Sequence, residues 1–241
     1  MKKLSVVIPA YNEEAFIGTL IQLIKNVPTE QLGFEKEIIV VDDGSKDKTF
    51  EIASSCEGVR VFKQVPNQGK GRAVLRGVAE STGDLILVQD ADLEYDPTDY
   101  LEMLRAWDPN RPTSVYGSRT LGQRRGGRGF WAALGRHPEQ SFGPWLAGVA
   151  LSIWTFMLYG RWISDTLTAY KLYPAGDYKR CDIKTYGFET DHELTAKLIR
   201  QGVKIVEVPI SYKPRSVEEG KKIKATDGLI ALWTLLRFRF Q

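Results

Sequence analysis

Apolar runs that fit buried strands alternate with helical patterns in the first third of the chain. The strand-like runs are LSVVIP, EIIVVD, VRVFKQ and DLILVQ. Helical periodicity lies between them, from about Glu14 to Asn26, near Lys48 to Ser55 and near Lys70 to Ser81. This alternation predicts an α/β fold, with a central, mainly parallel sheet that is covered by helices on both faces.

The pattern changes after the strand-like run TSVYGSR. Residues Arg119 to Arg136 contain five arginines and five glycines but no lysine and no acid, which predicts a mobile basic loop. The uncharged stretch from Pro144 to Gly160 fits either a core helix or a helix lying in a membrane surface. We predict no transmembrane helix, because this stretch is shorter than the ~20 residues that a span needs.

The regular order resumes in the last third of the chain. The strand-like run TAYKLYP is followed by a helical pattern across Glu193 to Arg200 and by the strand-like run KIVEVPISY. A final amphipathic helix ends in LLRFRFQ. We therefore expect a single domain over 1–241, which the change of pattern divides into 1–118 and 119–241, with a basic loop over 119–143 at the start of the second half.

The composition fits an ordinary globular protein of 241 residues, with 43% apolar and 26% charged residues. A net charge of +3 is too small to suggest a nucleic-acid partner. The two cysteines have no metal-binding spacing, and no signal peptide is recognisable before LSVVIP. These features favour a protein of the reducing cytoplasm.

Polar residues follow the predicted strands at their carboxyl ends, where α/β sheets bind ligands. PAYNEE and DDGS could be plain turns with a helix cap, because Asn, Pro, Asp and Gly are common turn residues. Alternatively, a carboxylate of DDGS accepts N–H bonds from a nucleobase. The segment NQGKGRA places Lys70 at a glycine-rich helix start, but its spacing is not that of a phosphate-binding loop.

Acids stand at every second position in the segment DADLEYD. Asp90 and Asp92 share one strand face, so their carboxylates can converge beyond the sheet. Two such groups repel each other unless a cation lies between them, and oxygen ligands favour Mg²⁺ or Mn²⁺. Such a metal would in turn bind a diphosphate. The alternative is a solvated acidic turn.

The segment ETDHEL offers a second group of acids. Asp191 is a candidate general base, although Asp191 and Glu193 could equally be the acids that favour the first turn of a helix. We expect His192 on the helix surface, without a catalytic role.

Seven segments resemble, in chain order, the family 2 glycosyltransferases of the dolichol-phosphate mannosyltransferase and bacterial polyprenyl-phosphate glycosyltransferase branch. They are VVIPAYNEE, VVDDGSKDKT, NQGKGRAVLRG, GDLILVQDADLEYDP, YGSR, GFETDHELTAKL and EVPISY. The resemblance implies a GT-A fold, an inverting mechanism, a nucleotide-sugar donor such as GDP-mannose or UDP-glucose, and a divalent metal.

The resemblance also implies that the half 1–118 binds the nucleotide sugar and the half 119–241 binds the acceptor, and it implies roles for single residues. The nucleotide sugar would be bound by residues near the strand ends: Pro9, Tyr11, Glu13, Asp42, Asp43, Gly44, Ser45, Lys70, Asp90 and Asp92. Asp42 would accept the base N–H, and Asp90 and Asp92 would serve ribose and metal, with Glu94 as a further ligand. Arg119 would contact phosphate. The segment after Arg119 differs from the family, so the acceptor-binding arginine could be Arg125, Arg128 or Arg136.

Arginine forks match phosphate oxygens bidentately, so five arginines without an acid favour a polyprenyl phosphate as the acceptor. A phosphate is already an anionic nucleophile, whereas a saccharide hydroxyl, the alternative acceptor, would need Asp191 as its base. A non-catalytic nucleotide-sugar-binding scaffold is a further alternative. The cations and aromatic rings predict peripheral binding to an anionic cytoplasmic membrane face, with Lys221, Lys222, Lys224 and the terminal LLRFRF contributing.

Overall fold

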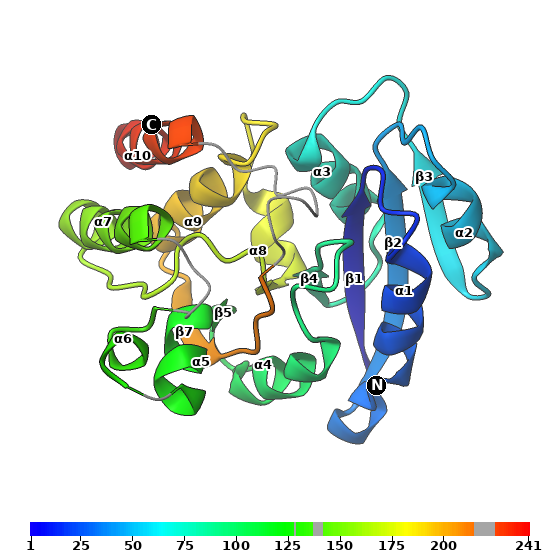
Figure 1. The fold of residues 1–241 in the computed structure, drawn as a ribbon, viewed down its shortest axis with the longest axis horizontal. Coiled ribbons are helices and arrows are strands. Elements are labelled where there is room, and N and C mark those ends of the chain that lie inside the picture. The colour runs from blue at the N-terminus through cyan, green and yellow to red at the C-terminus, as the bar shows by residue number, and fades with distance from the viewer. Residues whose placement is uncertain (128, 137–141, 215–224) are drawn as a thin grey trace.

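The computed structural model describes residues 1–127, 129–136, 142–214 and 225–241. A seven-stranded sheet in the order β3-β2-β1-β4-β6-β5-β7 forms the centre of the molecule (Figure 1). All neighbouring strands pair in parallel except β6, which is antiparallel to both β4 and β5. The α/β fold with a mainly parallel sheet is thereby confirmed. The strands are β1 (Lys2–Ala10), β2 (Phe34–Asp42), β3 (Val59–Lys63), β4 (Leu85–Val88), β5 (Thr113–Ser118), β6 (Lys171–Pro174) and β7 (Lys204–Pro209).

Helices cover both faces of this sheet. In β1, Leu4, Val6 and Ile8 pack toward a core that includes α1 (Ile17–Asn26) and α4 (Tyr100–Ala106). Val7 points to the opposite face, toward α3 (Lys70–Glu80) and α9 (Thr190–Arg200). Because successive residues of a strand face opposite sides, a continuous apolar run is the pattern of a strand buried on both faces. Two shorter helices, α2 (Thr49–Ser55) and α8 (Ala175–Arg180), complete the cover.

The arginine-rich region after β5 is helical in its described part. α5 (Arg119–Gly126) begins where the Ser118 hydroxyl accepts the Leu121 N–H at 3.0 Å, and α6 (Phe130–Ala133) follows. Gly122 lies so close to β7 that a Cβ there would stand 2.1 Å from the Ile210 carbonyl oxygen. The prediction of a loop from residue 119 is therefore wrong for α5 and α6. Glycine here permits close packing of a helix and is not a sign of mobility.

Two apolar helices lie side by side at the end of the molecule away from β3 (Figure 1). α7 (Phe142–Tyr159) and α10 (Ala225–Phe240) share a small core formed by Leu151, Ala231, Leu235 and others. Only 17% of α7 is buried, so it is not the core helix that was one of our two interpretations. α7 is long and apolar enough to cross a membrane. Length and composition alone do not distinguish such a helix from the core helix of a soluble protein.

Candidate active site

A cavity of about 1220 Å³ lies beyond the carboxyl ends of β4 and β5. Its charged lining includes Lys70, Asp90, Arg119 and Asp191, which come from four separate segments of the chain. α7 supplies a wall of small and apolar residues: Gly143, Pro144, Trp145, Ala147, Gly148, Val149, Leu151 and Ser152. Charged groups therefore meet an apolar surface inside one cavity.

Lys70 and Asp90 form an ion pair in which Nζ lies 2.5 Å from Oδ1. Burial lowers the pKa of Lys70, but the negative charges of Asp90, Asp191 and Asp92 outweigh burial, and the pKa is raised. The three carboxylates predicted for the site are thus gathered around one ammonium group. The segment before α3 carries Lys70 into this position.

The acids after β4 fit a divalent cation that takes most of its ligands from a diphosphate. Within the described part of the chain, no three His, Cys, Asp or Glu side chains form a metal-binding group. Asp92 is buried, its Oδ1 accepts the Glu94 N–H at 3.1 Å, and the Glu94 carboxylate accepts the Tyr212 hydroxyl at 3.1 Å. Mg²⁺ is commonly held by one or two carboxylates with phosphate oxygens, so two carboxylates would be enough. The assignment of Asp90, Asp92 and Glu94 as metal ligands stays a prediction.

Of the residues expected to hold the nucleotide sugar, Lys70 and Asp90 line the cavity. Those that lie at or just after the ends of β1 and β2 do not: Pro9, Tyr11, Glu13, Asp42, Asp43, Gly44 and Ser45. Asp42 is fully buried; its Oδ2 accepts the Ser45 N–H at 3.3 Å, and among the described residues its Oδ1 has no hydrogen-bond partner. This oxygen is buried, so contact of Asp42 with a base N–H stays a prediction. Pro9 and Glu13 are also buried, whereas Tyr11 is partly exposed.

Asp43 is used within the protein. It accepts the Gln64 side-chain amide at 2.9 Å and the backbone N–H groups of Gln68 and Gly69 at 2.8 Å each. These bonds fix the segment that leads into α3. Gly44 has a φ of +74° and packs against the backbone of Gln64 and Asn67, so this turn requires glycine. Direct contact of Asp43 or Gly44 with the nucleotide stays a prediction.

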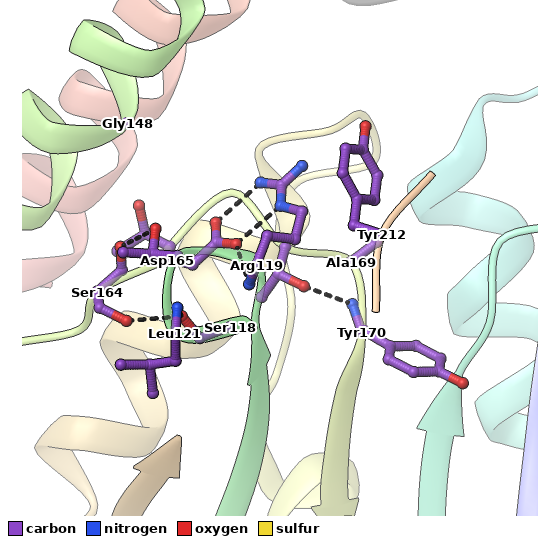
Figure 2. A network of polar contacts seen from close by, with 12 residues as sticks. Ser118, Arg119, Leu121, Gly148, Ser164, Asp165, Ala169, Tyr170 and Tyr212 are labelled. Atoms are coloured by element: carbon purple, nitrogen blue, oxygen red, sulfur yellow. Dashed lines mark hydrogen bonds and ion pairs between the residues drawn. The ribbon is translucent and has the colours of Figure 1, made fainter. Parts of the chain in front are cut away.

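Arg119 forms a two-pronged ion pair with a residue that the sequence did not point out. Its Nε and Nη2 donate to the two carboxylate oxygens of Asp165, at 2.7 and 2.8 Å, and its backbone N–H donates to Oδ2 at 3.0 Å (Figure 2). The Tyr212 ring lies beside the guanidinium, with Cζ 5.0 Å from the ring centroid. Burial raises the pKa of Asp165, but Arg119 more than offsets this, and the pKa is lowered.

The other predicted acceptor arginines occupy different places. Arg125 pairs with Glu102 at 3.0 Å on the surface and does not line the cavity. Arg136 stacks over Trp131, with Cζ 4.9 Å from the ring centroid. Arg128 lies outside the described residues. Arg124, which the sequence did not single out, lies five residues after Arg119 on α5 and lines the cavity.

The start of α9 corrects the expectation for His192, which is 5% exposed rather than on the helix surface. Burial, together with the positive charge of Lys171, lowers its pKa to about 3, so the imidazole is neutral. Glu193 is fully buried and accepts the N–H groups of Lys184 and Thr185 at 2.8 Å each, which makes it a structural anchor. Asp191 alone of the two acids lines the cavity.

Sequence comparison identifies the family. The family profile described as Glycosyl transferase family 2 matches residues 5–161, which is more than half of the chain. The chain belongs to glycosyltransferase family 2. It is therefore a glycosyltransferase, and the recognition made from the seven segments is confirmed.

Three relatives illustrate the similarity. An uncharacterized protein of Methanocaldococcus jannaschii is 29% identical over 225 residues, covering 90% of this chain and 85% of that protein. Dolichol-phosphate mannosyltransferase of Pyrococcus furiosus is 42% identical over 39% of this chain, and human dolichyl-phosphate beta-glucosyltransferase is 37% identical over 49%. The matches span only 27% and 41% of the latter two proteins, respectively.

Solved structures support the fold. Glucosyl-3-phosphoglycerate synthase of Mycobacterium tuberculosis, crystallised with Mn²⁺, UDP-glucose and glycerol 3-phosphate, matches 99% of this chain and 80% of that protein with a TM-score of 0.70 at 20% identity. A second structure of that enzyme, with Mn²⁺, UDP and phosphoglyceric acid, matches 99% of this chain and 78% of that protein with a TM-score of 0.68 at 21% identity. At this identity the match establishes the shared fold.

Proposed function

We propose that this glycosyltransferase moves a hexose from a nucleotide sugar to a polyprenyl phosphate, with inversion at the anomeric carbon and with Mg²⁺ or Mn²⁺ as cofactor. The observation that carries the proposal is the cavity, because it joins the charged groups Lys70, Asp90, Asp191 and Arg119 to the apolar wall of α7. A phosphate attached to a hydrocarbon chain matches both surfaces. Two relatives are named for dolichol phosphate or dolichyl phosphate, which agrees with this choice.

The donor end of the proposal rests on the residues after β1, β2 and β4. Among the described residues Oδ1 of Asp42 has no hydrogen-bond partner and would accept a base N–H, and Asp90 and Asp92 would hold the metal ion. When bound, the metal neutralises charge on the leaving diphosphate. The Lys70 ammonium lies among the same carboxylates, within reach of a diphosphate bound there.

At the acceptor end, Arg119 would orient the phosphate oxygen that attacks the sugar. A phosphate monoester has a second pKa near ~6, so at neutral pH it is a nucleophile without a base. Orientation by a guanidinium fork lowers the entropic cost of bringing acceptor and donor together. Asp191 faces the same cavity and would act on the sugar or on the electrostatics of Lys70, with no proton to remove.

A small phosphorylated acceptor is the second candidate. The structural neighbours were crystallised with phosphoglyceric acid or glycerol 3-phosphate, and Arg119 would suit any of these phosphates. A saccharide hydroxyl is the third, with Asp191 as the base. The apolar α7 wall favours the polyprenyl phosphate over both, because neither small acceptor has a hydrocarbon chain to place against it.

The test compares two variants on three acceptors: a polyprenyl phosphate, a phosphoglycerate and a saccharide, with a panel of nucleotide sugars and Mn²⁺. We expect transfer to the polyprenyl phosphate. Arg119→Ala should lower the rate by several orders of magnitude. Asp191→Asn should cost less than the roughly 10²–10⁴-fold typical of a lost general base.

An inactive Asp191→Asn enzyme together with an active Arg119→Ala enzyme on a saccharide would assign the reaction to a hydroxyl acceptor. Transfer to phosphoglycerate alone would assign it to the second candidate.

A further inference from the structure

Asp165 binds one edge of the Arg119 guanidinium, and a second edge can donate to another anion. A guanidinium has five N–H donors. The N–H of Nε and one N–H of Nη2 donate to Asp165. Among the described residues, the second fork, formed by Nη1 and Nη2, has no hydrogen-bond partner. The ring of Tyr212 lies beside the guanidinium (Figure 2). Arg119 also lines the cavity. An ion pair on one edge thus orients a fork of the size that phosphate oxygens accept.

Hydrogen bonds to Glu207 hold the backbone that carries Asp165. The Glu207 carboxylate on β7 accepts the Ser164 N–H at 2.8 and 2.9 Å, the Ser164 hydroxyl at 2.8 Å and the Asp165 N–H at 3.2 Å. The Ser164 hydroxyl also bonds the Ser118 hydroxyl at 2.7 Å, beside the start of α5. Asp165 is only 7% exposed. The Asp165 carboxylate is therefore held in one place, and it determines the orientation of the Arg119 guanidinium.

We propose that Asp165, anchored by Glu207, is a positioning residue that sets the direction of the free Arg119 fork and thereby the place of the acceptor phosphate. This inference rests on the proposed function for the identity of the acceptor, but it requires only that the acceptor carries a phosphate. Asp165 does not touch the reacting atoms. It acts through Arg119, whose free fork would otherwise rotate about its side-chain torsions.

The test is a double-mutant cycle with Asp165→Asn and Arg119→Lys, measured as KM for donor and acceptor and as kcat. Asp165→Asn should raise the acceptor KM by about 10- to 100-fold, as small misplacements of orienting groups do, and leave the donor KM within about twofold. Lysine has no planar fork to orient. In the Arg119→Lys enzyme, Asp165→Asn should therefore change the acceptor KM by less than about threefold.

The matched control is Asp177→Asn, which removes another buried aspartate ion pair, with Arg180 on α8, outside the cavity. It should leave the acceptor KM unchanged. If Asp165→Asn does not fold, Glu207→Gln takes its place and should raise the acceptor KM by a smaller factor. An unchanged acceptor KM, or an equal rise in the Arg119→Lys enzyme, overturns the inference.

The two proposals can fail separately. An enzyme that transfers sugar to a phosphoglycerate and not to a polyprenyl phosphate refutes the proposed acceptor, while the same cycle with that phosphate still decides the role of Asp165. An enzyme that uses only a saccharide hydroxyl refutes both.

Discussion

The Lys70 ammonium forms an ion pair with the Asp90 carboxylate, which would otherwise be available to a metal ion. Its Nζ is 2.5 Å from Asp90, and Asp92 and Asp191 add to the same field. A monovalent ammonium and a divalent cation would therefore compete for Asp90 until a diphosphate binds, when both could contact phosphate oxygens. Lys70 should thus oppose metal binding to the free enzyme and support it in the nucleotide complex.

We predict that Lys70→Met raises the affinity of the nucleotide-free protein for Mn²⁺ by about fivefold or more, since two unit charges 4 Å apart repel by about 1 kcal/mol even in bulk water. Calorimetric titration with Mn²⁺ measures this. Asp92→Asn should change the affinity in the opposite direction. Weaker Mn²⁺ binding by Lys70→Met would show that the ammonium does not compete with the metal.

The proximity of single residues was predictable where a motif and a strand end coincided, while their roles stay predictions. Asp90, Asp92, Asp191 and Arg119 were named from the sequence, and the structure brings them into one region. Asp165 was missed because its partner is 46 positions away and no motif links them. A signal did exist: Asp165 is the first acid after a stretch of 25 residues without one, and a lone acid after apolar sequence often has a buried partner.

At the scale of elements, the contact between α5 and β7 places Arg119 at the cavity. Gly122 allows this contact, and a methyl group there would meet the Ile210 carbonyl. We predict that Gly122→Ala lowers the free energy of unfolding by about 1–3 kcal/mol, the usual cost of overpacking. Urea unfolding measures this cost.

Gly126, also in α5, has nothing within 4 Å of an added Cβ. Gly126→Ala is the matched control and should be neutral or slightly stabilising, because alanine favours helix by about 1 kcal/mol. Equal effects of the two substitutions would mean that the close approach of α5 to β7 does not limit stability.

A second contact between elements depends on pH. Asp99, at the start of α4, accepts the Ser211 N–H at 2.7 Å, and burial raises its pKa from 3.8 to about 6. The folded protein thus holds this proton more tightly than the unfolded chain does. Stability should fall as pH rises from about 4 through 6, and Asp99→Asn, which cannot ionise, should abolish this loss.

We expect Asp99→Asn to raise Tm by about 2–5 °C at pH 8, given about 2–4 °C per kcal/mol for a chain of this size, and to make no difference near pH 4. Thermal unfolding across this range measures it. Asp182→Asn is the control, because the pKa of that exposed carboxyl is lowered by Lys184. A gain in Tm of the same size at every pH would show that ionisation of Asp99 is not the cause.

The elements of the sheet were largely predictable because their sequences are locally consistent. The runs around β1 to β7 were recognised as strands, since buried strands are apolar and punctuated by turn residues. The antiparallel direction of β6 was not, because nothing in the run TAYKLYP distinguishes the two directions. The helices α5 and α6 were missed because glycine and arginine suggested a loop, whereas tertiary contacts decide their structure.

For the whole molecule, the exposed apolar side chains gather on α7 and α10. Met157, Leu229 and Trp233 are each at least 62% exposed, and Ile153 and Phe156 lie on α7 as well. We propose that this surface binds the cytoplasmic membrane face peripherally. The contribution expected from Lys221, Lys222 and Lys224 falls outside the described residues.

The predicted division into halves 1–118 and 119–241 stays a prediction, although both contribute strands to one sheet.

Flotation with anionic liposomes tests the surface. Wild-type protein should float, and Trp233→Glu should reduce the bound fraction severalfold, because a charge replaces an aromatic ring at the membrane. Leu23→Glu on α1, which also replaces an exposed apolar side chain, should float like the wild type. A wild-type protein that stays in the aqueous fraction at both low and high salt refutes membrane binding.

α7 contributes both to the cavity and to the exposed apolar surface. Gly148 and Ser152 line the cavity, while Phe156 and Met157 are exposed. A helix docked in this way would open the site toward the lipid layer, so the acceptor would reach it by lateral diffusion within two dimensions. The quantity that governs saturation would then be the mole fraction of polyprenyl phosphate among the lipids. Adding inert lipid at a constant total amount of acceptor would slow the reaction, and adding water would not.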